Sequence, residues 1–119
     1  MAHQLQITQV REALEELDQA GLEEDYTLMI TKMLTNWGQI ADFIDYALLN
    51  HGYRTLTMMF YRGGKAVFVR FMKDRLGEWS FEGIALGQKV NWGYRWEYDL
   101  EKMEAHEIRK KVIVRTPGT

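Results

Sequence analysis

The first fifty residues place apolar side chains at the three- and four-residue spacing of amphipathic helices. A first helix is predicted over about residues 4–20, and its apolar positions are Ile7, Val10, Leu14 and Leu17. The same spacing then continues for so long that one straight helix would exceed the width of a small domain. We therefore expect a break at residues 36–39, where the sequence Asn-Trp-Gly-Gln offers a capping box. The break divides the segment into helices over about 22–35 and 37–51.

After Gly52 the apolar spacing changes to the two-residue alternation of β-strands. Predicted strands 54–61 and 66–73 flank a pair of glycines, which is a strong hairpin signal. If the two glycines form the turn, three facing pairs on one side of the hairpin are entirely apolar. These pairs are Phe60 with Val67, Met58 with Val69, and Leu56 with Phe71. A shift of one residue would scatter them, so the register is well specified.

Three more strands are predicted, at 78–86, 90–100 and 111–115. Gly83 lies where the alternation of the first of these strands changes phase, which indicates a β-bulge. The second strand alternates aromatic with polar residues along its whole length. Residues 99–110 allow two interpretations: a short helix, or a continuation of the strand that turns back on itself.

These elements predict an α+β fold made by a single domain, residues 1–119. Two or three N-terminal helices pack on one face of a four- to five-stranded antiparallel sheet, whose strands follow one another as a meander. The chain has 119 residues and 46% of them are apolar, which is enough to bury one core but not two.

The composition excludes several classes of function. The chain has no cysteine, so it has no disulfide framework, no Cys-based zinc site and no thiol nucleophile. Its first residues lack the features of a signal peptide, and no apolar run is long enough to span a membrane. We expect a cytoplasmic protein without membrane contact.

Charge is distributed unevenly along the chain. Residues 1–50 carry two basic and nine acidic side chains, whereas residues 51–119 carry thirteen basic and eight acidic ones. Like charges face each other across the predicted hairpin, namely Arg62 with Lys65 and Arg54 with Lys73. Acidic groups should relieve this repulsion. The chain's own acidic helices are the simplest source, with an acidic protein or phosphate as alternatives. The sequence pI of about 5.9 disfavours nucleic acid.

Aromatic residues are concentrated near the C-terminal end of the predicted sheet. They are Trp79, Phe81, Trp92, Tyr94, Trp96 and Tyr98. The simplest interpretation is that they form the core face of the sheet, because aromatic residues favour strands. Three functional interpretations remain open: anchors of a protein interface, platforms that stack unpaired bases, or the lining of an apolar pocket.

The hairpin face that points away from the helices mixes apolar and polar side chains. Helices can cover only one face of the sheet, so the other face is covered by the C-terminal segment or by another molecule. Methionine, aromatic residues and arginine are typical of protein interfaces. The residues that we predict to bind a partner are Tyr61, Phe68, Arg70, Met72, Trp92, Tyr94 and Trp96.

Catalytic chemistry has little support in the sequence. Asp42, Asp45 and His51 share one predicted helix, but a solvated helix face explains the two carboxylates as well, and a helix C-terminus favours a cationic histidine. No metal-binding motif or cofactor-binding motif is present, so we predict neither metal nor cofactor, and enzymatic activity is the less favoured class.

The preferred hypothesis for function is a small non-catalytic binding or regulatory protein. It acts on a protein partner through the sheet face, with a homodimer as one form. A cone-shaped domain that binds a small apolar ligand or performs simple acid–base chemistry is the first alternative. Binding of single-stranded nucleic acid is the second alternative.

Overall fold

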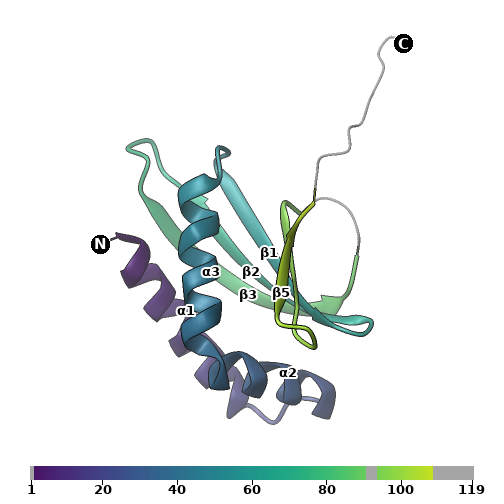
Figure 1. Ribbon diagram of the computed structural model, residues 1–119. Helices are drawn as coiled ribbons and strands as arrows, with labels where there is room; N and C mark the ends of the chain where they lie inside the picture. The colour runs from purple at the N-terminus through teal and green to yellow at the C-terminus, as the bar shows by residue number, and fades with distance from the viewer. Residues whose placement is uncertain (1, 91–93, 109–119) are drawn as a thin grey trace.

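The computed structural model of the protein describes residues 2–90 and 94–108. Three helices come first, α1 (Ala2–Asp18), α2 (Glu24–Thr35) and α3 (Trp37–Asn50). Five strands follow, β1 (Thr55–Arg62), β2 (Lys65–Lys73), β3 (Trp79–Gln88), β4 (Trp96–Asp99) and β5 (Glu104–Glu107). The helices lie together on one face of the sheet, with α3 across the centre and α1 beside it (Figure 1). The predicted α+β class, with helices before the sheet, is confirmed.

The break between α2 and α3 occurs at Asn36, as predicted. However, the Asn36 side chain does not cap the start of α3. Its Nδ2 donates instead to the Lys32 carbonyl oxygen at 2.9 Å and so satisfies a carbonyl at the end of α2. The break is therefore where it was predicted, but Asn36 stabilises the end of α2 rather than the start of α3.

The predicted hairpin is found with its predicted register. Strands β1 and β2 pair antiparallel, and Phe60 faces Val67 while Leu56 faces Phe71. A register shift between β2 and β3 at Arg70 leaves one extra residue in β3, next to Gly83. The β-bulge inferred from the change of phase is thus present at the expected place.

The order of the strands differs from the predicted meander. The sheet order is β3-β2-β1-β4-β5, and β4 runs parallel to β1 with Trp96 beside Met58. The chain therefore does not turn back from β3 into β4 as a hairpin. It rejoins the sheet at Trp96, on the side of β1 that is away from β2. Strand β4 covers only the last part of the predicted strand 90–100, of which residues 91–93 lie outside the described residues.

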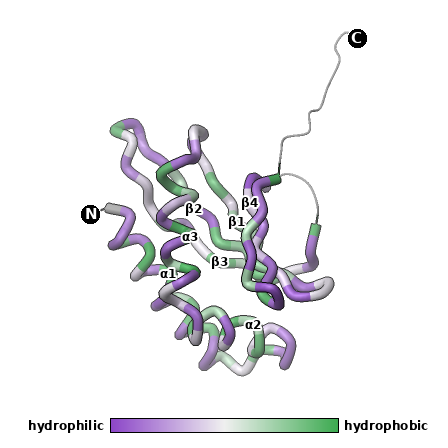
Figure 2. Tube along the Cα trace, in the orientation of Figure 1, coloured by the Kyte–Doolittle hydropathy of each residue, from purple (hydrophilic) through white to green (hydrophobic). Residues whose placement is uncertain are grey.

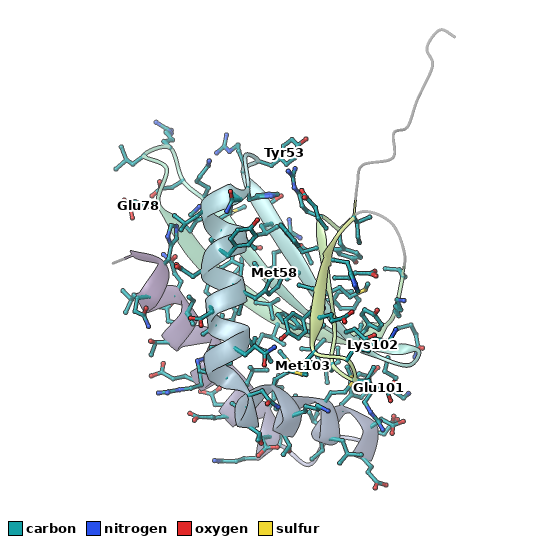
Figure 3. All side chains as sticks on the ribbon, viewed as in Figure 1. Tyr53, Met58, Glu78, Glu101, Lys102 and Met103 are labelled. Carbon is teal, nitrogen blue, oxygen red and sulfur yellow. The ribbon has the colours of Figure 1, made fainter. Side chains whose placement is uncertain are left out.

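A tight turn separates β4 from β5 where a helix had been an alternative (Figure 3 labels Glu101, Lys102 and Met103). Asp99 Oδ1 accepts hydrogen bonds from the backbone N–H groups of Glu101 at 2.9 Å and Lys102 at 3.1 Å. This is how a helix-capping aspartate acts, but Met103 adopts a φ of +55°, which ends the turn. Of the two alternatives for this segment, the described residues show the strand that turns back, and β5 follows. The predicted strand 111–115 lies outside the described residues.

The main core is formed by residues of the helices and of the sheet, and the hydrophobic segments that contribute to it are green in Figure 2. Its largest fully buried side chains come from all three helices and from the hairpin, and they include Leu14, Ile30, Met33, Ile44, Met58, Phe60 and Phe71. Met58 points from the middle of the sheet toward α3 (Figure 3). We call this side of the sheet the helix-facing side and the opposite side the second face.

Candidate functional site

Five of the seven residues that we predicted to bind a partner lie on the second face. Tyr61 of β1 and Phe68, Arg70 and Met72 of β2 alternate with core residues, so their side chains point away from the helices. Tyr94 joins them because its ring lies 5.3 Å from the ring of Phe68, at an interplanar angle of 33°. The structure thus brings together residues that are far apart in sequence.

Part of the second face is covered by Lys89, which follows β3, and by Tyr94, which precedes β4. Met59 has no exposed surface, although it lies outside the main core. Phe68 and Tyr94 stack beside it, and the Lys89 Nζ lies 4.0 Å from the centre of the Tyr61 ring. The sequence had suggested the C-terminal segment as a cover for this face. In the described residues Lys89 and Tyr94 cover part of it. The prediction for the C-terminal segment falls on residues 109–119, which lie outside the described residues.

The neighbouring part of the second face is open, and we call it the open strip. It consists of Thr57, Arg70, Met72 and Glu82. Met72 is 41% exposed, and the Arg70 Nε lies 3.1 Å from the Glu82 Oε1. The ion pair keeps the guanidinium in position beside the methionine without burying either charge. A flat surface with an apolar centre and a polar margin results.

The remaining two predicted residues do not join this surface. Trp96 points to the helix-facing side, where it is only 8% exposed and packs against Phe43 and Tyr46 at ring distances of 5.5 and 5.9 Å. Trp92 lies outside the described residues. The alternation from Val90 to Leu100 had placed Tyr94 and Trp96 on the same face. They lie on opposite faces because the strand begins only at Trp96.

The space around β4 on the helix-facing side is filled by aromatic rings. The ring of Phe43 lies 5.2 Å from that of Tyr98 and 6.3 Å from that of Phe60. Tyr98 and Phe60 are themselves 5.3 Å apart. These edge and tilted contacts are the usual packing of buried aromatic residues. Burial also raises the pKa of the Tyr98 hydroxyl, which disfavours its ionisation.

Most basic side chains of the sheet contact acidic or aromatic groups of the same chain. Arg62 lies 3.6 Å from Glu101, and Lys65 lies 3.1 Å from Glu23 at the start of α2. The hydrogen bond to the Glu23 carboxylate and the negative charge of that carboxylate raise the pKa of Lys65. The repulsion between Arg62 and Lys65 is therefore relieved from within the chain, and the partner of Lys65 comes from the acidic helical half, as predicted.

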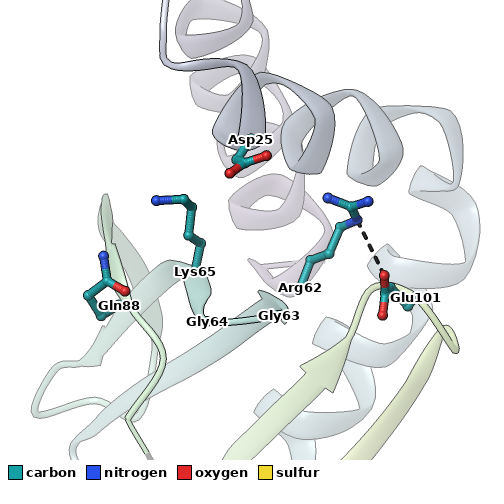
Figure 4. A pocket seen from close by; sticks show the side chains of 7 residues that line it. All are labelled: Asp25, Arg62, Gly63, Gly64, Lys65, Gln88 and Glu101. Carbon is teal, nitrogen blue, oxygen red and sulfur yellow. Dashed lines mark ion pairs between the residues drawn. The ribbon is translucent and has the colours of Figure 1, made fainter.

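These ion pairs border an open polar pocket at the hairpin turn. It is lined by Asp25, Arg62, Gly63, Gly64, Lys65, Gln88 and Glu101 (Figure 4). Two cationic and two anionic groups face it, so their formal charges cancel. The pocket consequently has no strong preference for an anionic ligand, and the paired glycines belong to the turn rather than to a phosphate loop.

His51 is a buried neutral histidine. It is 7% exposed, and its Nε2 donates to the Thr55 carbonyl oxygen over 2.6 Å. Burial lowers the pKa of His51 below its ordinary value of 6.5, and the nearby charges of Arg95 and Lys73 act in the same direction. The expectation that the helix C-terminus would favour a cationic histidine was wrong, because desolvation outweighs the helix dipole.

The helical carboxylates do not share a site with this histidine. The Asp45 Oδ1 lies 3.7 Å from the Nδ1 of His3, which is in the first turn of α1. Asp42 is exposed. Among residues 2–90 and 94–108, no group of three or more histidine, aspartate or glutamate side chains could hold a metal ion. Within the same residues, no helix is long and apolar enough to cross a membrane.

Three exposed apolar residues near the end of α3 were not noticed in the sequence. Tyr46, Leu49 and Tyr53 are each more than half exposed, and the Arg95 guanidinium lies 5.6 Å from the centre of the Tyr53 ring (Tyr53 is labelled in Figure 3). Helical spacing from Tyr46 to Leu49 was the available signal. Neither residue belongs to the apolar stripe of the same helix, so both could have been recognised as exposed.

Comparisons of the chain with family models, with curated proteins and with solved structures found no match.

Proposed function

We propose that the protein is a small non-catalytic binding module, and that its partner is another protein that docks on the open strip. The observation that carries the proposal is the exposed Met72 with Arg70 at its side and the Phe68–Tyr94 pair at its border. Methionine, arginine and aromatic side chains are enriched in protein interfaces, where they combine large contact area with polar anchoring. The rigid sheet beneath them needs little rearrangement to receive a partner.

A protein partner is favoured over nucleic acid by the state of the cations. Nucleic acids are held mainly by cationic side chains that replace counterions of the phosphates. Here Arg62, Lys65 and Arg70 each contact a glutamate of the same chain, and the net charge is −2. Binding of phosphate would have to break these pairs. We therefore expect the affinity for the partner to change little with salt concentration.

A small apolar ligand is also less favoured. That function needs free space between the sheet and the helices. The rings of Phe43, Phe60, Trp96 and Tyr98 contact one another in this region instead. A ligand would have to displace well-packed side chains, at a cost comparable to making a cavity in a core.

The proposal can be tested by photo-crosslinking at a single position of the strip. A photoreactive phenylalanine analogue replaces Met72 in one version of the protein. In the control version it replaces Leu76, which is 87% exposed in the turn between β2 and β3 and is not a residue of the strip. Both versions are irradiated in cells that express them. We expect discrete protein adducts from position 72 that are absent from position 76.

Charge substitutions complete the test. Met72→Glu should abolish the adducts formed by a probe at Arg70, whereas Leu76→Glu should leave them unchanged. Identical adducts from positions 72 and 76, or adducts that persist in the Met72→Glu background, would exclude the open strip as the docking surface. Light scattering of each variant shows whether the captured partner is a second copy of the chain.

A further inference from the structure

Strand β3 leaves a long edge of the sheet unpaired. The strand order places β3 at one edge and β5 at the other, and the two edges differ greatly. Strand β3 (Trp79–Gln88) has ten residues, whereas β5 (Glu104–Glu107) has four. Short and charged edge strands resist pairing with other chains, and long neutral ones invite it. The β3 edge is therefore the place where another strand can add to the sheet.

The outward-facing backbone groups of β3 can be identified from the ladder. The Lys89 N–H donates to the Gly64 carbonyl oxygen at 2.8 Å, so this pair exchanges hydrogen bonds between β3 and β2. Such pairs alternate along an antiparallel ladder. Consequently the N–H and C=O groups of Gln88, Leu86 and Ile84 point away from β2. In the described part of the chain, no other segment forms a backbone hydrogen bond with these three residues.

An apolar margin accompanies these backbone groups. The side chains of Phe81, Ile84 and Leu86 point to the helix-facing side and pack against the core, but they are only partly buried because the sheet ends beside them. An added strand would cover their exposed surface while it pairs with the backbone. The margin therefore gives a pairing strand apolar contact in addition to its hydrogen bonds.

A second copy of this chain suits the edge. Glu82 is the one charged residue of β3, and Arg70 already neutralises it at 3.1 Å. Two β3 strands would thus approach each other without repulsion between unpaired charges, and the net charge of −2 adds little at long range. The β5 edge differs, since two of its four residues, Glu104 and Glu107, are glutamates.

We propose that two copies of the protein pair antiparallel through β3, about a two-fold axis, and form one continuous sheet of ten strands. Antiparallel pairing lets the same residues serve both partners, so the interface is complementary to itself. The backbone groups that would pair, those of Ile84, Leu86 and Gln88, are not part of the open strip, although Glu82 borders both surfaces. This inference therefore does not rest on the function proposed above, and each can fail alone.

The first test compares molecular mass by sedimentation equilibrium up to about 1 mM protein, a range that detects weak self-association. The wild-type chain should show a dimer. Ile84→Lys places an inward-pointing lysine on the edge, which is how natural edge strands avoid pairing, and it should give a monomer. The matched control is Leu28→Lys, which removes an exposed leucine from α2 and adds the same charge. This variant should remain dimeric.

The second test does not depend on the folding of the lysine variant. Because the chain has no cysteine, a single Ala85→Cys substitution places one thiol beside the edge, on the exposed face of β3. Pairing centred near this residue brings the two thiols within roughly 8 Å. A short bismaleimide should then link two chains efficiently, whereas Leu28→Cys should link at the background rate.

Three outcomes would overturn the proposal: a wild-type monomer at all concentrations, equal crosslinking at positions 85 and 28, or a folded Ile84→Lys variant that stays dimeric. A dimer that is lost in Met72→Glu but kept in Ile84→Lys would locate self-association on the open strip. That result would contradict the β3 interface and support the proposed function.

Discussion

The adjacent residues Met58 and Met59 offer a sharp test of how the second face is covered. Both have no exposed surface, but Met58 belongs to the main core while Met59 lies on the second face, paired with Phe68. Met72 lies on the same second face as Met59, outside the covered part, and is 41% exposed. Substitution of each methionine by alanine removes the same atoms from three different surroundings.

The expected costs follow from burial. Replacing a fully buried methionine by alanine lowers the free energy of unfolding by about 2–5 kcal/mol, since apolar contact is lost and a cavity remains. We expect Met58→Ala and Met59→Ala both to fall in this range. Met72→Ala should cost less than about 1 kcal/mol, because solvent already reaches the side chain and no cavity forms.

Urea unfolding at neutral pH, followed by far-ultraviolet circular dichroism, measures the three values on the same scale. The slope of the free energy with urea should stay constant, which shows that the variants unfold from the same compact state. A cost for Met59→Ala close to that of Met72→Ala would refute the reasoning. It would mean that Lys89 and Tyr94 do not shield the second face in solution.

Two further predictions concern titratable groups. The pKa of His51 is lower in the folded chain than its ordinary 6.5, so the unfolded chain takes up the proton more readily. The free energy of unfolding should therefore fall as the pH drops through about 6.5. Urea midpoints measured over this pH range should show the decrease in the wild type but not in His51→Gln. Burial works against the charged form of Asp99, but the N–H groups of Lys102 and Glu101 outweigh it and lower its pKa. Asp99→Ala should therefore cost about 1 kcal/mol at pH 7, by analogy with a helix cap. Because protonation removes the charge that these N–H groups stabilise, the variant and the wild type should converge once the pH falls below the Asp99 pKa.

Elements with local determinants could be predicted from the sequence. The hairpin register follows from three apolar pairs that no other alignment keeps together, of which Met58 with Val69 is the central one. The bulge follows from a change of phase at Gly83. In both cases the decisive information lies within about twenty residues, where the pattern and the turn chemistry act together.

The placement of β4 could not be predicted in the same way. An alternating segment looks identical whether it pairs with the preceding strand or crosses the sheet and pairs with β1. Tyr94 and Trp96 are two positions apart in sequence, as two residues on one face of a strand would be. However, the strand begins only at Trp96, so Tyr94 is not part of it. The choice depends on which edge of the hairpin is free, and that is a property of the assembled sheet.

The candidate site was partly predictable for the same reason. Phe68, Arg70 and Met72 share one face of a strand, so simple alternation grouped them correctly. Lys89 was missed, because its contact with the Tyr61 ring exists only after the chain has crossed the sheet. The exposed area of the strip is set by the path of that connection, which the sequence pattern does not determine.

The parallel pairing of β1 with β4 has a consequence for the order in which the chain assembles. Residues paired between β1 and β2 are close in sequence, so the entropy lost in closing their loop is small. Met58 and Trp96, in contrast, meet only after the β3 strand and the crossing have been positioned. Pairings of high contact order form slowly. We therefore expect the hairpin to form first, and β4 and β5 to add late at the free edge of β1.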